Sequence, residues 1–409
     1  QFFSFTSPDG TPVYLGLSRD IVAHETGHAV LDGLAPALYD ALTPQSLALH
    51  EAIGDLTAIV MALQSPRIRG WLLKKSGGRL TDDTPISSIA DEFGYAIGLK
   101  RALRNASNPF KIGEVSEECH ALCQVLTGAF WKAIVQINNS YLDKANLPPG
   151  SPDLGDKLGI SARRISRILF RALDYLPPAE ATFADYCRAV LRSDEAAYPE
   201  DKDGYRKILR QEFNKRGIVG KDSELDCRPE EEWVRVNLED ILESEWAAYA
   251  FAEKMRKLLK IPPQVPFRLF PRRDVMRRYY LGPGRFEDRR EVVFQLTWEK
   301  PEENIGIPIR SRRRGVFHGT TLVFGGKPDG KGRYPLLSCL TTDRSEPQEE
   351  ARNRTVLRLV ERGQIAIGNR RVSFNSRPLA PRVFGRVTDS TLRLRGTARL
   401  IQLTEFKHE

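Results

Sequence analysis

The spacing of two histidines near the start of the chain constrains it more than any other feature. Residues 24–28 read His24-Glu25-Thr26-Gly27-His28, an H-E-x-x-H motif. On a helix, residues i and i+4 share one face, so His24 and His28 can both face one metal ion. Two neutral imidazoles suit Zn²⁺, and Glu25 can reach a water on that ion without ligating it. The motif therefore indicates zinc-dependent hydrolysis, most often of a peptide bond.

Local signals predict one helix around the motif and a second helix after it. Ser18 can cap the first helix, which we expect to end near Pro36. Thr43 and Pro44 are typical of the N-cap and the first position of the second helix. Gly27 costs a helix about 1 kcal/mol relative to alanine. A close approach by substrate or by another backbone would explain a glycine there.

A tetrahedral zinc site needs a third protein ligand, and the second helix offers one. Enough chain separates Glu51 from His28 for a loop and a returning helix. A carboxylate at Glu51 would complete a His₂Glu set. Asp55, one turn further on, can accept the hydrogen bond that orients the imidazole of His24. Acidic residues at this spacing also suit a solvated helix face, but this helix is strongly apolar.

The stretches 24–30 and 50–55 together resemble the active-site region of thermolysin-type gluzincin metallopeptidases. That family has H-E-x-x-H-A-V on one helix and an N-E-A-x-S-D-like stretch on the next. The resemblance implies a metalloprotease, a hydrolase that uses one Zn²⁺ ion. Carried over residue by residue, it makes His24, His28 and Glu51 the zinc ligands, Glu25 the general base, Asp55 the partner of His24, and Tyr39 a residue that helps to hold the tetrahedral oxyanion.

Two later segments also match the family. Residues 103–109, Leu-Arg-Asn-Ala-Ser-Asn-Pro, are similar to the family's L-R-S-M-x-D-P segment, whose arginine binds a substrate carbonyl. The resemblance gives this role to Arg104. Residues 120–131 are similar to the helix that opens with the family's catalytic histidine, so His120 becomes the second oxyanion donor. Without that context, a lone histidine at a helix start is more typical of capping or of a surface position.

The chain departs from the family pattern at two positions beside the site. His50 stands where the family usually has asparagine before the third ligand, and it could adjust His28, bind a second ion or simply pack. Val115 stands where the family has the aspartate that orients the catalytic histidine. That orienting role is open to Glu114, Glu117 or Glu118.

Calcium sites and the N-terminal β lobe of the family are mostly missing. Asp20 matches one calcium-ligating position, but no acidic cluster follows the second helix, so we expect calcium to be absent or reduced. Only residues 1–17 precede the first helix, and a Pro8-Asp9-Gly10 turn predicts a hairpin there. Either the sequence is a fragment or the lobe is much reduced.

The remainder of the chain predicts helices first and strands later. Helical patterns cover 116–137, 157–176, 182–192 and 204–215, and a further helix is expected at 238–259. Short alternating runs that predict strands lie at 292–298, 320–324, 355–360, 364–367, 371–374 and 391–403. We therefore predict an α+β fold: a mainly helical zincin lobe with a truncated β lobe (1–220), an acidic linker and helix (221–264), and an appended β-rich domain of unknown function (265–409).

Arginine is concentrated in the predicted β domain and supplies much of the net charge of +9. The densest cluster is Arg310-Ser311-Arg312-Arg313-Arg314. Such a face can bind an anionic partner, but an arginine-rich face is more often simply solvated. Since no nucleic-acid module signature is present, we do not expect a nucleic acid as partner. A peptide or protein substrate is the expected partner, and the oligomeric state is left open.

Compartment signals in the sequence are weak. No apolar run approaches the ~20 residues needed to span a bilayer, so no transmembrane segment is expected. Five cysteines, an odd number without a C-x-x-C pair, indicate free thiols rather than a disulfide framework. No signal peptide is visible. These features slightly favour the cytoplasm, whereas the family is mostly secreted.

Two functions follow as expectations. The first is a metalloendopeptidase in which Zn²⁺ and Glu25 activate water. The alternative is an inactive gluzincin scaffold whose Arg-rich β domain is a binding module for an anionic partner.

Overall fold

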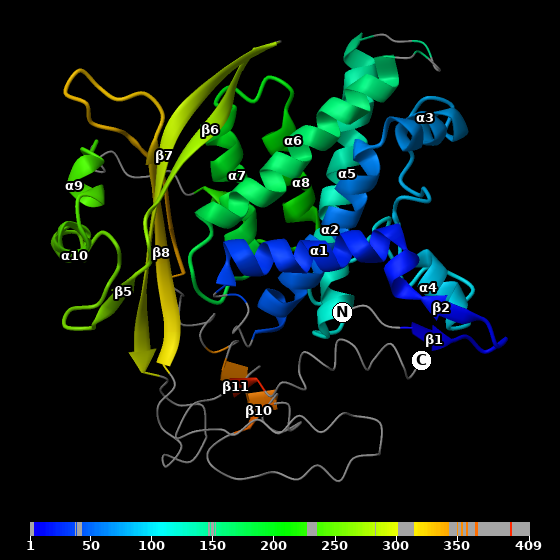
Figure 1. The fold of residues 1–409 in the computed structure, drawn as a ribbon, viewed down its shortest axis with the longest axis horizontal. Helices are drawn as coiled ribbons and strands as arrows, with labels where there is room; N and C mark the ends of the chain where they lie inside the picture. Colours follow the sequence, from blue (N-terminus) through cyan, green and yellow to red (C-terminus); the bar gives the residue numbers. More distant parts are fainter. Residues whose placement is uncertain are drawn as a thin grey trace.

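The chain is a mixed structure of helices and strands, as expected for an α+β protein. The computed structural model describes residues 4–342 apart from 37, 39–42, 146–147, 149–150, 152, 227–234, 283 and 302–314. Beyond 342 it describes residues 350, 353–354, 357–358, 365–366 and 393–394. Figure 1 shows the main sheet beside the helical part of the protein. The first two helices cross each other within that helical part.

Helices α1 (Arg19–Leu34) and α2 (Pro44–Gln64) confirm the two helices predicted around the motif. Ser18 and Thr43 are their N-caps, and Pro44 occupies the first helical position of α2. Gly27 lies where α1 meets α2: a Cβ added to it would stand 2.9 Å from the Cα of Gly54. The close approach expected at Gly27 is therefore an approach of another backbone.

Four further helices form the largest core together with α2. They are α5 (Cys119–Ala145), α6 (Asp153–Tyr175), α7 (Phe183–Ala197) and α8 (Tyr205–Lys215). Each contains most of a predicted helix, with bounds shifted by a few residues. Large buried side chains such as Trp131, Tyr186 and Phe213 fill the space between them. This apolar packing holds α2 at the centre of the helical part.

Small elements complete the surroundings of α1. Strands β1 (Ser4–Thr6) and β2 (Pro12–Tyr14) form the predicted hairpin, with Gly10 at a φ of 86° in its turn. Helix α3 (Pro66–Lys75) follows α2 directly, and α4 (Asp91–Ala96) is a short helix. Strand β3 (Ser88–Ile89) pairs with β4 (Arg104–Asn105). This two-residue ladder sets the position of Arg104.

The main sheet has five antiparallel strands. They are β5 (Phe267–Leu269), β6 (Arg273–Gly282), β7 (Arg285–Pro301), β8 (Gly315–Gly325) and β9 (Leu336–Thr341). The order is β5-β7-β8-β9. Strand β6 also pairs with β7, along the part of β7 that precedes its pairing with β5. The predicted strands at 292–298 and 320–324 are the central parts of β7 and β8. Short strands β10 (Ile365–Ala366) and β11 (Arg393–Leu394) pair within two of the other predicted runs.

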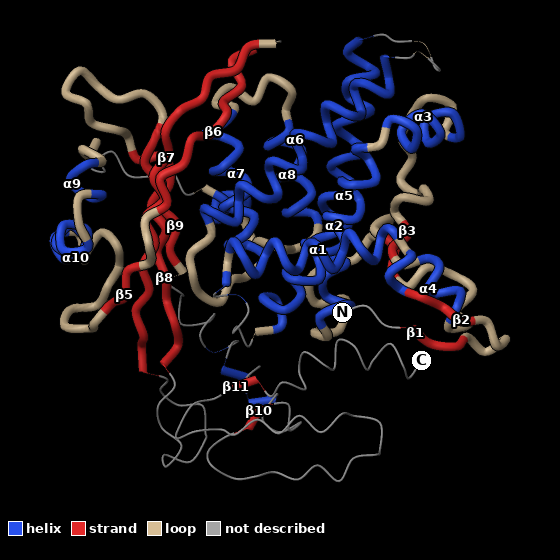
Figure 2. The backbone as a smooth tube through the Cα atoms, in the orientation of Figure 1, coloured by secondary structure: helices blue, strands red, loops and turns tan. Residues whose placement is uncertain are grey.

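Helices cover both faces of the sheet. On one face, Val292, Phe294 and Leu296 pack with α9 (Glu239–Leu242) and α10 (Glu245–Lys254). On the other face, Val293 and Val323 belong to the same core as the large helices. Figure 2 shows the strands between α9 and α10 on one side and α6 and α7 on the other. The core thus continues across the predicted boundaries at 220 and 264.

Two local predictions in this half of the chain are wrong. The single helix expected at 238–259 is two helices, because Ser244 takes an extended backbone (φ −156°) and its side chain accepts a hydrogen bond from the Ala247 backbone N–H, which caps a new helix. In the strand predicted at 355–360, the described residues Leu357 and Arg358 are helical. The predicted strand at 371–374 lies outside the described residues.

Helix α2 is long and apolar enough to cross a membrane, whereas no transmembrane segment was expected from the sequence. However, 89% of its most apolar window is buried inside the protein, as in the core helix of a folded domain. The described cysteines, Cys119, Cys123, Cys187 and Cys339, form no disulfide with one another.

A buried ion cluster joins α6 to the sheet. Arg171 and Tyr279 both donate to the Glu291 carboxylate, whose side chain is fully buried. Asp174, one turn after Arg171, accepts from Arg273 at 2.6 Å and also from Arg277. Because an unpaired buried charge is very unfavourable, these pairs hold helix and sheet in one relative position.

Replacing Glu291 with alanine should destabilise the protein by about 3 kcal/mol, because Arg171 would remain buried without its carboxylate. Urea unfolding of full-length protein measures this change. The matched control is Glu287→Ala on the same strand, whose exposed carboxylate pairs with Arg289 and should contribute less than about 0.5 kcal/mol. Equal effects of the two substitutions would contradict a stabilising role for the buried cluster.

Candidate metal centre

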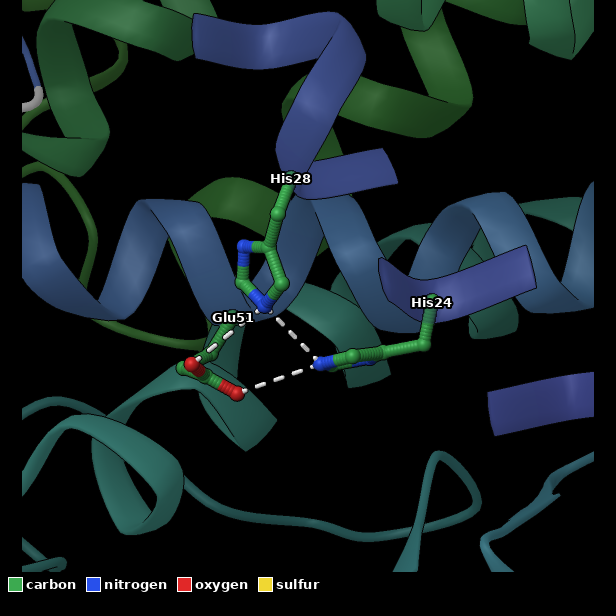
Figure 3. A group of neighbouring side chains, drawn as sticks. All are labelled: His24, His28 and Glu51. Carbon is green, nitrogen blue, oxygen red and sulfur yellow. Dashed lines mark hydrogen bonds and ion pairs between the residues drawn. The ribbon is translucent and has the colours of Figure 1, made fainter. Parts of the chain in front are cut away.

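Three side chains from α1 and α2 converge at one point. Figure 3 shows His24 and His28 pointing from α1 toward Glu51 on α2. The two histidine Nε2 atoms lie 3.0 Å apart. Glu51 Oε2 lies 3.4 Å from His24 Nε2, and Glu51 Oε1 lies 3.6 Å from His28 Nε2. These are the three residues that the sequence predicted as zinc ligands, and the fold brings them together.

The donor spacing fits one tetrahedral ion. Ligands at ~2.0–2.1 Å from a tetrahedral Zn²⁺ lie ~3.3 Å from one another. The three separations here bracket that value, and the set of two imidazoles and one carboxylate suits zinc. One position of the tetrahedron would remain for a non-protein ligand. The residues present therefore fit the metal that the resemblance implies.

The charge states of the three groups differ because their neighbours differ. Burial lowers the pKa of His28 to about 3, so its imidazole is neutral at physiological pH. Burial would also lower the pKa of His24, but contacts with Asp55 and Glu51 outweigh it and raise the pKa to about 9. Burial opposes ionisation of Glu51, yet His120 and His28 hold its pKa well below the usual range. Glu51 is therefore an ionised carboxylate.

Asp55 supports His24 from behind. Its carboxylate is completely buried, and Oδ1 lies 2.9 Å from His24 Nδ1. Arg104 donates to both oxygens of Asp55, with Nη2 to Oδ1 at 2.6 Å and Nε to Oδ2 at 3.0 Å. Burial would raise the pKa of Asp55, but Arg104 outweighs it and lowers the pKa to about 2. The contact between Asp55 and His24 is the one that the sequence predicted.

The structure places Arg104 inside the site but against protein rather than in the open. Its side chain is buried, and Nη2 also lies 3.9 Å from Glu51 Oε2. Nη1 is a buried atom with no hydrogen-bond partner among the described residues. The predicted contact of Arg104 with a substrate carbonyl stays a prediction.

Gly54 is a functional position that the sequence analysis missed. A Cβ at Gly54 would stand 2.7 Å from both Cε1 and Nδ1 of His24. Only glycine lets the His24 ring lie across α2 between Glu51 and Asp55. A glycine inside a strongly apolar helix, directly before Asp55, was the signal in the sequence.

His120 opens α5 on the other side of Glu51. Its Nε2 lies 3.4 Å from Glu51 Oε2. Its Nδ1 lies 2.6 Å from Glu118 Oε1. Burial would lower the pKa of His120, but Glu51 and then Glu118 outweigh it and raise the pKa. His120 therefore faces the ligand cluster with one nitrogen and is held by a carboxylate through the other.

Of the three glutamates that the sequence left open for orienting His120, Glu118 is the one in contact with its ring. Its carboxylate also accepts from the backbone N–H groups of His120 and Ala121, at 3.0 and 2.8 Å, and so caps α5. Glu114 instead accepts from the Lys111 backbone, and Glu117 pairs with Arg358. The side chains of Glu118, Cys119 and His120 also lie close enough together to hold a metal ion. However, the Glu118 carboxylate is already engaged in capping α5 and in its contact with His120.

His50 packs on the cluster. Its ring stacks on His28, with centroids 6.0 Å apart, and Nδ1 lies 3.9 Å from Asp32 Oδ1. Burial lowers the pKa of His50, so the ring is neutral at physiological pH. Of the roles open to His50, this geometry supports packing against and adjusting His28. Asp32 was not singled out from the sequence.

The structure describes one of the two other predicted catalytic residues. Glu25 follows His24 on α1 and is half-buried. Tyr39 lies outside the described residues. The Arg310–Arg314 cluster also lies outside them, whereas Arg273, Arg277 and Arg290 of the sheet pair with acidic residues.

Comparison with known proteins adds no family assignment. No protein-family model matches the chain, and no solved structure is significantly similar to it.

The substitution Gly54→Ala should lower zinc affinity by about 10-fold or more, because the new methyl group would displace the His24 ring from Glu51 and Asp55. A chelator competition titration measures it. Gly70→Ala, also within a helix but with open space around the added carbon, is the matched control and should bind zinc like the wild type. Unchanged affinity in Gly54→Ala would contradict the site geometry.

The substitution Glu118→Gln should lower the pKa of His120 in metal-free protein. The carboxylate contact raises this pKa, so removing its charge favours the neutral imidazole. An NMR titration of the His120 Cε1–H resonance measures the change. Glu117→Gln is the control and should leave the pKa where it is, since Glu117 pairs elsewhere.

Proposed function

We propose that this protein hydrolyses peptide bonds with one Zn²⁺ ion held by His24, His28 and Glu51. The observation that carries the proposal is the convergence of these three side chains from two helices, with donor atoms 3.0–3.6 Å apart. Asp55 behind His24 and His120 beside Glu51 add the polar surroundings that a hydrolytic zinc site requires. When bound, zinc supplies Lewis-acid chemistry, polarising a carbonyl and lowering the pKa of a water to about 7.

In the proposed reaction, side chains of the protein would transfer the protons and stabilise the charge that develops on the substrate. Glu25 would accept the proton of the attacking water and then donate it to the leaving amine. His120, through Nε2, would donate a hydrogen bond to the carbonyl oxygen as it gains negative charge. Tyr39 would assist at the same oxygen. Arg104 would hold the substrate backbone.

The arrangement of helices supports a gluzincin-like lobe. Helices α1 and α2 cross at Gly27 and Gly54. A third helix, α5, brings His120 into contact with Glu51. The hairpin β1–β2 stands where a larger N-terminal lobe would be expected. We place the substrate along α1, since His24, Glu25 and His28 all lie on that helix.

The alternative of an anion-binding module has less support. The ligand set is intact, which an inactive scaffold does not require. Arginines of the described sheet, such as Arg273 and Arg290, are engaged with Asp174 and Asp274 rather than gathered on one open face.

Purified full-length protein should hold one zinc per chain and cleave casein or a peptide library. Glu25→Gln should keep the zinc and lose at least ~100-fold in kcat, because glutamine cannot accept a proton. Glu51→Ala should lose the zinc itself. Elemental analysis and peptide hydrolysis give the two readouts.

Thr26→Ala is the matched control for Glu25→Gln. Thr26 is exposed on the same helix and bonds only the Val22 carbonyl at 2.7 Å in the described structure, so its loss should leave kcat unchanged. Cleavage that survives Glu25→Gln, or protein without stoichiometric zinc, would falsify the proposal.

A further inference from the structure

One loop connects two site residues, Arg104 and His120, that do not come from α1 or α2. Arg104 stands in β4, just before residues 106–118, and His120 stands in the first turn of α5, just after them. Arg104 contacts Asp55, and His120 contacts Glu51. The conformation of this loop therefore sets how the two side chains approach the ligand helix α2.

Arg216 ties the middle of the loop to α8. It is the C-cap residue of α8, and its side chain is buried. Nη2 donates to the Asn108 carbonyl at 2.6 Å, and Nη1 donates to Asn108 Oδ1 at 2.8 Å and to the Phe110 carbonyl at 3.0 Å. The Arg216 carbonyl in turn accepts from the Ile112 N–H at 2.9 Å. One residue thus holds both ends of the segment 108–112.

Asn108 extends this connection to both functional ends of the loop. Its Nδ2 donates to the Asn105 carbonyl at 2.9 Å, directly beside Arg104. The same group donates to the Gln124 carbonyl at 3.1 Å, one helical turn beyond His120. A displacement of Asn108 would therefore reach Arg104 through the backbone of β4 and His120 through the first turns of α5.

Gly128 makes room for the guanidinium. A Cβ at Gly128 would stand 2.6 Å from Nη1 and 2.9 Å from Cζ of Arg216. The side chain therefore lies directly against the backbone of α5. Helix α8 is itself anchored to α5, since the Phe213 and Phe130 rings pack with centroids 5.5 Å apart. The guanidinium spans from a rigid helix pair to the loop.

The surroundings of Arg216 favour a positioning role over an ion pair. Its hydrogen bonds within the described structure run to neutral oxygens, and burial lowers the pKa of Arg216. Burying a charge is unfavourable unless hydrogen bonds compensate for the lost water, and the oxygens around Arg216 supply such bonds. The planar guanidinium of arginine has several N–H donors in fixed directions, so it can bind two carbonyl oxygens and a side-chain amide oxygen at once. The ammonium group of lysine lacks these fixed directions.

We propose that Arg216 is a positioning residue that fixes the loop 106–118 and thereby places Arg104 and His120 against Asp55 and Glu51. It contacts neither substrate nor metal, and it acts through Asn108. The catalytic part of this proposal rests on the proposed peptidase function, while the structural part does not.

Hydrogen exchange tests the structural part first. In full-length Arg216→Ala, amide exchange across 106–118 should rise by about 10-fold or more, while peptides of α1 and α2 should stay protected. Gly128→Ala should give the same local effect by displacing the guanidinium, and alanine favours the helix, so this variant should fold. The matched control is Arg210→Ala, which removes another multiply bonded arginine of α8 that holds Asp222 and Asp226 on the outer surface.

Activity tests the catalytic part. Arg216→Ala and Gly128→Ala should keep one zinc per chain and lose about 10- to 100-fold in kcat, because displacements of about 1 Å reduce rates on that scale. Arg216→Lys should recover little, whereas millimolar guanidinium ion should restore part of the kcat of Arg216→Ala. Arg210→Ala should retain the wild-type kcat.

The outcomes separate the two proposals. If exchange across 106–118 is unchanged in both Arg216→Ala and Gly128→Ala, the positioning role is wrong, whatever the activity. If exchange rises but kcat and its guanidinium response do not differ from the control, the loop is held by Arg216 without consequence for catalysis, and the catalytic part is wrong. If the wild type cleaves nothing, the proposed function fails while exchange still decides the role of Arg216.

Discussion

The crossing of α1 and α2 at Gly27 and Gly54 is the constraint on which the site depends. Because neither glycine carries a side chain, the helix backbones approach closely and the His24 ring lies across α2. In that position its two nitrogens reach Glu51 and Asp55, which are one helical turn apart. Any wider separation of the helices would remove one of the two contacts, and with it either the ligand set or its support.

Charge within the site is balanced by partners from several elements. Glu51 faces His24, His28 and His120, while Asp55 takes both hydrogen bonds of Arg104. Two buried carboxylates on an apolar helix are tolerable only because these partners surround them. The same physical rule governs the sheet, where the buried Glu291 is matched by an arginine of α6. Buried ions therefore specify how the helices meet each other and the sheet.

Features with local causes were predictable from the sequence. The helices α1, α2 and α5–α8 and the first hairpin follow from caps, periodicity and turn residues. The candidate ligands His24 and His28 follow from i, i+4 spacing, whereas Glu51 was predicted from the need for a third ligand and from the family resemblance. Strand β6 was not recognised, because its arginines look solvated until Asp174 pairs with Arg273 and Arg277. The break at Ser244 was also missed, since the helical pattern continues across it. Three glutamates could serve His120 in sequence; capping of α5 by Glu118 decides among them.

By itself, the sequence determined which chemistry the chain can present: His24, Glu25 and His28 on one helix, and Glu51 and Asp55 on the next. These relations are local, because helix geometry alone puts residues four apart on one face. The tertiary structure decided that the two helices meet at glycines, that His120 reaches Glu51, and that Arg216 reaches the loop 106–118. Those relations join residues far apart in the chain, and only the packing of α5 and α8 around α2 brings their atoms within bonding distance.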